Sequence, residues 1–189
     1  MTKNAAVKVE KSELIFKGRV MEVLRDEIIE PSGIKAIREW VRHPGSVVVL
    51  PVFPDGRILL IRQYRYAAAQ VMWELVAGHK ESDEDFKTGA HRELEEESGY
   101  TAKKMTKLLE FFPSPGFLSE KMVVFLAQGL TKGKPRQEED ENIDQRIVTL
   151  NQAEDWIRTG KIRDAKTISG ILFYAIFTRA RLKNAGRMR

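Results

Sequence analysis

GHKESDEDFKTGAHRELEEESGY, residues 78–100, is the stretch from which the rest of the chain can be interpreted. The three consecutive acids at residues 83–85 favour the positive end of a helix, and Ser82 before them is a suitable N-cap. Gly99 accepts the left-handed conformation in which many helices end. The stretch therefore predicts a helix over residues 83–98 that begins after Ser82 and stops at Gly99.

The acids of this predicted helix gather on one face. At about 100° per residue, Glu93, Glu96 and Glu97 fall within one sector, whereas Glu95 points away from it. Like charges at this spacing repel one another unless a cation compensates them. Carboxylate oxygens are hard ligands, which suit Mg²⁺ or Mn²⁺ better than zinc. Arg92 lies four residues before Glu96 and is expected to pair with it.

Apolar runs bounded by turn residues predict a strand-rich first half, with strands at residues 13–30, 35–42, 46–53 and 58–65. Pro-Asp-Gly at residues 54–56 is typical of a tight turn and predicts a hairpin that joins the last two of these strands. SVVVLPV, which follows Gly45, is apolar on both faces and indicates a central strand covered by helices on each side. An α/β layer fold follows.

Two more strands and two helices are expected in the second half of the chain. The strands lie at residues 103–112 and 121–128. Asn151 and Glu154 form a predicted capping box for the first helix, which stops near Gly160. The last helix has an apolar stripe made of Ile168, Ile171, Leu172 and Ala175.

Composition limits the class of protein. A length of 189 residues suits one domain, since domains usually run to about 100–200 residues. The chain has no cysteine, which excludes disulfides, thiolate metal sites and cysteine nucleophiles and is typical of a reducing compartment. No apolar run approaches the ~20 residues of a membrane span. We expect a cytoplasmic protein without a membrane partner.

The formal net charge of +5 raises the question of nucleic-acid binding. Five basic residues without any acid lie in residues 179–189, so the remainder of the chain is formally neutral. A basic tail is usually a solvated end of the chain. This tail has no interleaved aromatic residues, and the chain has no recognised nucleic-acid-binding motif. We therefore expect no nucleic-acid partner.

The helix region fits the pattern G-x5-E-x7-R-E-U-x-E-E-x-G-U, where U is a bulky apolar residue, and through this pattern the chain resembles the Nudix family. The matching positions are Gly78, Glu84, Arg92, Glu93, Leu94, Glu96, Glu97, Gly99 and Tyr100. An aliphatic residue is more usual where Tyr100 stands. The resemblance implies an α/β/α sandwich with a mixed sheet over residues 46–189, preceded by an N-terminal antiparallel sheet over residues 1–45 that forms a homodimer.

The same resemblance implies a pyrophosphatase, which hydrolyses a phosphoric anhydride in a nucleoside diphosphate linked to another group, with Mg²⁺ or alternatively Mn²⁺. Glu93 and Glu97 match the main metal ligands, and Glu96 shares the site and is also a catalytic candidate. The carbonyl of Ala77 is a further implied ligand. The supporting residues are Gly78, Glu84 and Arg92.

Segments outside the helix look like ADP-ribose pyrophosphatases over nearly the whole chain: EWVRHPGSVVVLPV, RQYRYA, WELVAGHKE and SPGF. Pro115 stands 16 residues beyond Gly99, a placement that resembles this group. The residues implied to bind substrate are Arg38 and Arg65 at the nucleotide and pyrophosphate, Glu120 near the terminal ribose, and Arg19 beside the base. For both Arg38 and Arg65 the alternative is an arginine on the surface of a strand.

Residues 136–144, RQEEDENID, are too acidic for a covered strand and indicate a solvated loop. The resemblance implies that this loop covers the substrate, with Glu139 taking a proton from the attacking water and Glu141 as the alternative base. Two other functions stay open. The protein could be a broad nucleoside diphosphate sugar hydrolase that also takes GDP-mannose and UDP-glucose, or a non-catalytic regulator that binds ADP-ribose.

Overall fold

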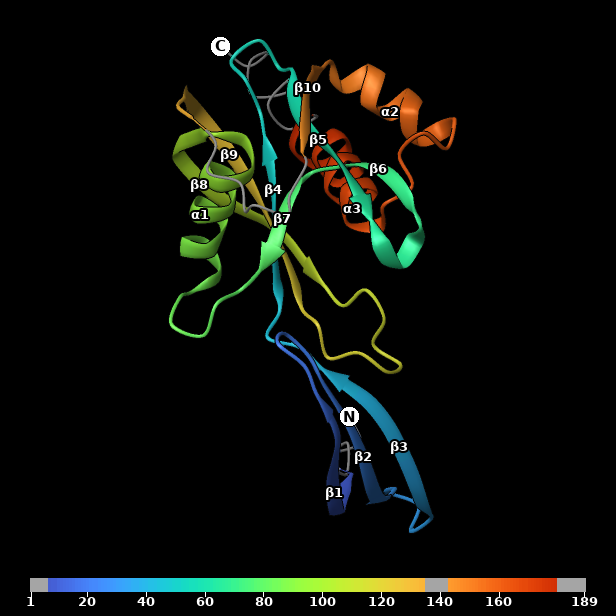
Figure 1. The fold of residues 1–189 in the computed structure, drawn as a ribbon. Helices are drawn as coiled ribbons and strands as arrows, with labels where there is room; N and C mark the ends of the chain where they lie inside the picture. The colour runs from blue at the N-terminus through green and yellow to red at the C-terminus, as the bar shows by residue number, and fades with distance from the viewer. Residues whose placement is uncertain (1–6, 135–142, 180–189) are drawn as a thin grey trace. The chain divides into compact units, whose positions relative to one another are not determined.

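The computed structural model describes residues 7–134 and 143–179 (Figure 1). The chain forms two compact units. Unit 1 comprises Met1–Gly45 and Phe112–Lys121, and unit 2 comprises Ser46–Phe111 and Met122–Arg189. The loop that contains Pro115 therefore belongs to unit 1 together with the N-terminal strands. No helix within the described ranges is long and apolar enough to cross a membrane.

Unit 1 is built on one antiparallel sheet of order β1-β2-β3. Its strands are β1 (Lys8–Lys17), β2 (Glu22–Ile29) and β3 (Lys35–Arg42). The single strand predicted over residues 13–30 is wrong, because the chain reverses at Gly18, whose N–H donates to the carbonyl of Met21 at 2.8 Å. All ten residues of β1 are exposed.

Unit 2 contains two sheets. The larger one has the order β7-β4-β9-β8, and the smaller one has the order β10-β5-β6. β4 is antiparallel to β7 and parallel to β9, so the larger sheet is mixed. The strands are β4 (Ser46–Pro51), β5 (Ile58–Arg65), β6 (Gln70–Glu74), β7 (Val76–His79), β8 (Tyr100–Phe111), β9 (Met122–Lys132) and β10 (Asp144–Val148), with a 3₁₀ turn η1 (Tyr66–Ala68) between β5 and β6.

The central strand β4 is buried along its whole length, as its unbroken apolar sequence predicts. Side chains alternate between the faces of a strand. Val47 and Val49 belong to the apolar cluster that includes Leu94 of α1, whereas Val48 and Leu50 belong to the cluster that includes residues of α2 and α3. Helices therefore cover both faces of this part of unit 2 (Figure 1), which confirms the predicted α/β/α sandwich.

The turn at residues 54–56 is present, but the predicted hairpin is confined to the residues next to it. β4 pairs with β7 and β9, whereas β5 pairs with β6 and β10. The two segments that flank the turn are joined next to it by an antiparallel bridge between Val52 and Ile58 and by the N–H of Phe53, which donates to the carbonyl of Arg57 at 2.9 Å. Turn residues specify where the chain reverses, and they leave open whether the flanking strands stay paired beyond the turn.

The helices begin at other residues than their sequence predicts. They are α1 (Phe86–Ser98), α2 (Leu150–Arg158) and α3 (Ala165–Phe173), and the last continues as the π-helical turn η2 (Tyr174–Arg179). Ser82 is not the cap of α1, because the side chain of Asp85 accepts the N–H of Thr88. Asn151 and Glu154 do not form a capping box either, since Thr149 caps α2. Several nearby residues can cap a helix, and packing of the first turn selects one of them.

Candidate active site

Helix α1 positions the acids predicted to bind metal. Its N-terminus is fixed by Asp85, and Gly99 ends it with φ 73° and an N–H that donates to Glu95. Between these ends, Ala90 and Leu94 pack into the core of unit 2. Glu93 and Glu97 lie on the same inward side as Leu94, with 8% and 3% of their surface exposed. The helical period thus turns two carboxylates toward the sheet.

Glu97 is held against strand β7. One oxygen of its carboxylate accepts the backbone N–H of Ala77 at 3.0 Å. Ala77 in turn is paired with Val48 of the central strand. The carboxylate therefore has a fixed position beside the residue whose carbonyl the sequence proposes as a further metal ligand.

Glu93 occupies the space above Gly78. A Cβ atom added at Gly78 would lie only 2.0 Å from the Glu93 Oε1 atom. Any residue other than glycine would have to push the carboxylate aside. The glycine of the sequence motif is thus explained by the close approach of a carboxylate to the β7 backbone.

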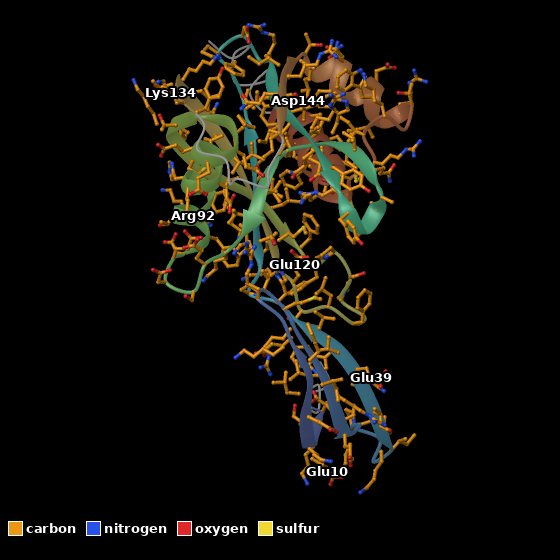
Figure 2. The ribbon with its side chains drawn as sticks, in the orientation of Figure 1. Glu10, Glu39, Arg92, Glu120, Lys134 and Asp144 are labelled. Atoms are coloured by element: carbon orange, nitrogen blue, oxygen red, sulfur yellow. The ribbon has the colours of Figure 1, made fainter. Side chains whose placement is uncertain are left out.

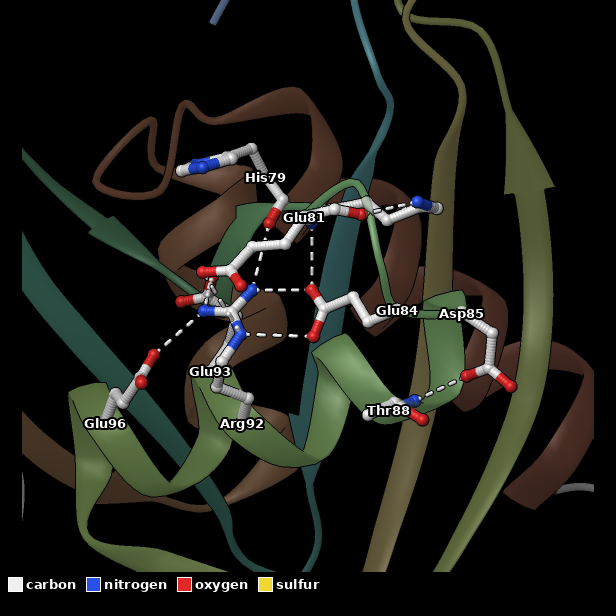
Figure 3. Close-up of polar contacts among 9 residues, drawn as sticks. His79, Glu81, Glu84, Asp85, Thr88, Arg92, Glu93 and Glu96 are labelled. Carbon is white, nitrogen blue, oxygen red and sulfur yellow. Dashed lines mark hydrogen bonds and ion pairs between the residues drawn. The ribbon is translucent and has the colours of Figure 1, made fainter. Parts of the chain in front are cut away.

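Arg92 joins the remaining acids of the helix region. Its guanidinium donates to Glu84 at 2.8 and 3.2 Å, to Glu93 at 2.7 Å and to Glu96 at 2.8 Å, as Figure 3 shows. It also donates to the carbonyl of His79 at 3.1 Å. The predicted pairing of Arg92 with Glu96 is confirmed. We call Arg92, Glu84, Glu93 and Glu96 the Arg92 cluster.

The charges in this cluster stabilise one another. Hydrogen bonds to Glu84, followed by the charge of Glu93, raise the pKa of Arg92 above its ordinary value. Hydrogen bonds from Arg92 lower the pKa of Glu84. Since one guanidinium faces three carboxylates in the cluster, and Glu97 is close by in the sequence, the acids outnumber the cation.

The acids fit a hard divalent cation by their chemistry and by the space that Gly78 leaves for Glu93. Within residues 7–134 and 143–179, however, no three acidic or histidine side chains form a ready ligand group. A cation bound here would need further oxygen ligands, such as the phosphates of a substrate. Glu84 accepts two hydrogen bonds from Arg92, and Gly78 leaves room for Glu93, while their supporting roles stay predictions.

Arg65 lies in a second charged cluster of unit 2. Its Nε and Nη2 donate to the two carboxylate oxygens of Glu74 at 2.8 and 2.6 Å. Lys166 donates to Glu74 at 2.5 Å and to Asp164 at 2.8 Å. We call Arg65, Glu74, Asp164 and Lys166 the Glu74 cluster. The Arg65 side chain is 39% exposed, whereas that of Glu74 is 1% exposed, so the role of Arg65 at the substrate stays a prediction.

The carboxylate of Glu74 is fully buried and ionised. Burial opposes its ionisation, but hydrogen bonds from Arg65 and the charge of Lys166 outweigh burial and lower its pKa. The sequence analysis did not identify Glu74, Asp164 or Lys166. A signal for the first was present, because an acid within the apolar segment WELVA is rarely buried without a cationic partner.

The other predicted substrate residues belong to unit 1. Arg38 is exposed, pairs with Glu30 and donates to the carbonyl of Ile37. Arg38 and Pro115 line one cavity of about 370 Å³ together with Trp40 and Phe117. The structure therefore brings Arg38 and the Pro115 loop together within unit 1.

Glu120 and Arg19 do not line this cavity. Glu120, labelled in Figure 2, has a carboxylate oxygen 3.8 Å from Nδ1 of His43. Arg19 is exposed in the turn between β1 and β2. Glu139 and Glu141, the predicted general base and its alternative, lie outside the described residues.

Comparison with known proteins agrees with this architecture. The family model described as NUDIX domain matches residues 42–169. ADP-ribose pyrophosphatase of Bacillus subtilis (strain 168) is 40% identical over 85% of this chain and 88% of the relative. The "Methanol dehydrogenase activator" of Bacillus methanolicus is 38% identical over 86% of this chain and 89% of the relative.

A solved structure, "Crystal structure of ADP compounds hydrolase", superposes with a TM-score of 0.82 at 23% identity. The match covers 99% of this chain and 100% of the solved chain, and at this identity it shows the fold. The family model spans more than half of the chain, and it includes the whole of α1 with its carboxylates. The chain therefore belongs to the NUDIX domain family.

Proposed function

We propose that this protein hydrolyses the pyrophosphate bond of ADP-ribose to AMP and ribose 5-phosphate with Mg²⁺, for which Mn²⁺ is an alternative. The observation on which the proposal rests is the buried pair of carboxylates, Glu93 and Glu97, held against Ala77 and Gly78 of β7. The 40% identical relative named ADP-ribose pyrophosphatase supports the choice of substrate.

Residues of unit 2 have the following proposed roles in the reaction. Glu93, Glu96 and Glu97, with the carbonyl of Ala77, hold divalent cations, and Arg92 keeps Glu96 in place. When bound, divalent cations neutralise the pyrophosphate and lower the pKa of a water molecule. Water adds to one phosphorus, the bridging P–O bond breaks, and each product keeps one phosphate.

A general base must accept a proton from the attacking water. Glu139 is the proposed base and Glu141 the alternative, on the resemblance of the acidic segment alone. Glu139→Gln should lower kcat about a hundredfold, because positioned proton transfer contributes ~10² to 10⁴. A larger defect in Glu141→Gln would assign the base to Glu141.

The identity of the substrate is the more specific part of the proposal. The cavity of unit 1, with Trp40, Arg38 and Glu39 on its lining, offers an aromatic ring, a guanidinium and a carboxylate to a nucleoside. The relative from Bacillus methanolicus is nearly as similar, and its name describes activation of another enzyme. The acids present at every position of the metal motif favour a hydrolase here.

A substrate panel tests the function. ADP-ribose, GDP-mannose, UDP-glucose and nucleoside triphosphates are compared with Mg²⁺ by kcat/KM, which measures discrimination between transition states. ADP-ribose should be the best substrate, and its products should be AMP and ribose 5-phosphate. Preference for a hexose nucleotide would replace the substrate and keep the mechanism. Preference for triphosphates, or binding without turnover, would refute the proposal.

The proposed assembly is a homodimer in the cytoplasm. The cysteine-free composition supports the location. Strand β1 exposes Leu14, Ile15 and Phe16, each with more than half of its surface in solvent, and such edge strands usually need a cover. A second copy of the chain is the proposed cover. Light scattering should give twice the chain mass of 21.7 kDa, and a monomer would refute the dimer.

A further inference from the structure

The Glu74 cluster ties two neighbouring strands of unit 2 to a helix that lies far along the chain. Arg65 ends β5, Glu74 ends β6, and Lys166 lies in the first turn of α3. The side chain of Glu74 is 1% exposed, and that of Lys166 is 11% exposed. An ion network buried to this extent is costly to form unless its geometry and its charges are matched. Its members are therefore expected to fix one another in place.

The N-terminus of α3 holds the backbone beside Glu74 as well. Asp164 caps the helix by accepting the N–H of Thr167 at 2.9 Å. The hydroxyl of Thr167 donates to Asp164 and accepts the N–H of Leu75 at 2.8 Å. Leu75 directly follows Glu74 in the chain. Helix α3 thus anchors the end of β6 through both a side chain and the backbone.

Glu74 fixes the orientation of the Arg65 guanidinium. Two of its nitrogens, Nε and Nη2, are used by the carboxylate, and Nη1 has no hydrogen-bond partner among the described residues. The pKa of Arg65 is raised first by the hydrogen bonds to Glu74 and further by the charges of Glu97 and Asp164. Glu97 accepts the N–H of Ala77, which follows Glu74 by three residues, so the chain brings this acid near the Glu74 cluster. The remaining edge of the guanidinium is a donor for an anion bound beside that acid.

Glu74 binds this guanidinium through two hydrogen bonds, and Lys166 links Glu74 to a second carboxylate, that of Asp164. Lys166 contacts both acids, at 2.5 and 2.8 Å, and so neutralises Asp164 while it leaves Arg65 to Glu74. The four charges sum to zero. Loss of Lys166 would leave two acids and one guanidinium, which could then turn toward either acid.

We propose that Glu74 and Lys166 are positioning residues for substrate binding, which hold Arg65 in the one orientation that presents Nη1 to the diphosphate of the substrate. The inference rests on the proposed function for the identity of the substrate. Neither residue touches the reacting atoms. Their effect reaches the substrate through Arg65, and Lys166 acts by balancing the charge of Asp164.

The test compares binding in Lys166→Met, Lys166→Arg and Lys104→Met. Affinity for ADP-ribose is measured by calorimetry in EDTA, where metal-dependent hydrolysis cannot proceed. Lys166→Met should weaken binding about tenfold, a size typical of coupled charged neighbours, and Lys166→Arg should retain most of the affinity. The exposed Lys104→Met, which has the same change of charge outside the cluster, should bind as the wild type does.

Two further variants separate positioning from support of the fold. Asp164→Asn keeps a helix cap and removes the competing charge, so its addition to Lys166→Met should restore affinity to within about threefold of the wild type. In an Arg65→Ala background, Lys166→Met should change affinity less than about twofold. Melting temperatures of all variants show whether each one folds. If the single variant Lys166→Met does not fold, the effect of Lys166→Met is measured in the Asp164→Asn background instead. The affinity of the double variant is then compared with that of Asp164→Asn alone.

Three outcomes would overturn the inference: unchanged affinity in Lys166→Met, an equal loss with and without Arg65, and no recovery on addition of Asp164→Asn. Absence of any ADP-ribose binding by the wild type would also overturn it. Failure of the proposed function is a separate result. If the wild type binds ADP-ribose but does not cleave it with Mg²⁺, the function is refuted and the positioning role stands.

Discussion

The Arg92 cluster and the Glu74 cluster use the same residue types in opposite proportions. In the first, a single guanidinium faces the carboxylates of Glu84, Glu93 and Glu96. In the second, two cations and two acids balance. Carboxylates in excess repel one another until a further cation binds and neutralises them. A network with equal numbers of cations and acids needs no further ion. The comparison separates a site that awaits a ligand from one that holds a side chain in place.

The two clusters also differ in how far apart their members lie along the chain. The acids of the Arg92 cluster lie between residues 84 and 96, on one helix and the loop before it. Lys166 and Glu74 are 92 residues apart in sequence. The Arg92 cluster is thus local and can rearrange around a ligand, whereas the Glu74 cluster joins separate elements and resists rearrangement. Substitutions at the acids proposed to bind metal should therefore mainly change turnover, whereas substitutions in the Glu74 cluster should change stability and ADP-ribose affinity.

The largest expected effect is on turnover. Glu93→Gln and Glu97→Gln should each lower kcat with Mg²⁺ by roughly a thousandfold or more, which corresponds to ~4 kcal/mol of lost transition-state stabilisation. Without metal, the melting temperature should stay equal or rise, because a repelling charge is removed from the helix. Glu95→Gln, on the other side of α1, is the control. Near-normal turnover in both variants would contradict the metal assignment.

Gly78→Ala should leave the fold intact and lower kcat about a hundredfold. The added Cβ would lie 2.0 Å from Oε1 of Glu93, which is the far end of a flexible side chain and can swing away. A displacement of about 1 Å at a reacting centre can cost ~10² in rate. Steady-state kinetics and thermal unfolding measure the two effects. A variant with full activity would show that Glu93 does not need its position above β7.

In the balanced cluster, Glu74→Gln should lower stability, besides weakening ADP-ribose binding through Arg65. The free energy of unfolding at neutral pH should fall by about 2 kcal/mol, less than the ~3–5 kcal/mol of a fully buried pair, because Arg65 is partly exposed. The pKa of Glu74 is lower in the folded chain than its ordinary value of 4.5. Its stabilising effect is therefore complete above 4.5 and is lost as the pH falls through the folded pKa.

Urea unfolding at several pH values measures this contribution. The difference between the wild type and Glu74→Gln should be constant near neutral pH and should shrink as the solution is acidified below 4.5. A difference that grows on acidification would mean that the folded pKa is raised, and that the network is not balanced as described.

The smallest expected effect concerns Arg92. In Arg92→Gln without metal, the melting temperature should fall by about 2–4 °C, the shift expected for a loss of ~1 kcal/mol in a chain of this size. Saturating Mg²⁺ should reduce the difference in melting temperature between Arg92→Gln and the wild type, because the bound metal would then neutralise the acids. Thermal unfolding with and without Mg²⁺ measures this difference. An equal difference under both conditions would mean that Arg92 and the metal act on separate groups.

Much of the candidate site follows from local sequence. The helix predicted at residues 83–98 is observed over Phe86–Ser98, and the inward face of Glu93 and Glu97 follows from helical periodicity. Residues three or four apart on a helix share a face in any tertiary context, so Arg92 and Glu96 could be paired before the structure was known. The buried central strand was also predictable from local sequence, because its apolar run has no polar face.

The partners of those elements depended on tertiary structure. Turn residues 54–56 predicted a reversal, but β4 pairs with β7 and with the distant β9. Strand pairing is selected by the burial of whole faces, which is a property of the assembled sheet. The strands β6, β7 and β10 are only four or five residues long, too short for a periodic signal to stand out.

The family, the helix with its acids and the layered fold could be predicted from the amino-acid sequence, because each depends on spacing along a continuous segment. Only the tertiary structure revealed that Gly78 leaves room for the carboxylate of Glu93, and that Lys166 and Asp164 meet Glu74 and Arg65. The physical reason is the range of the interactions. Helical periodicity acts over a few residues, whereas a buried charge can take its partner from any element that the folded core brings beside it.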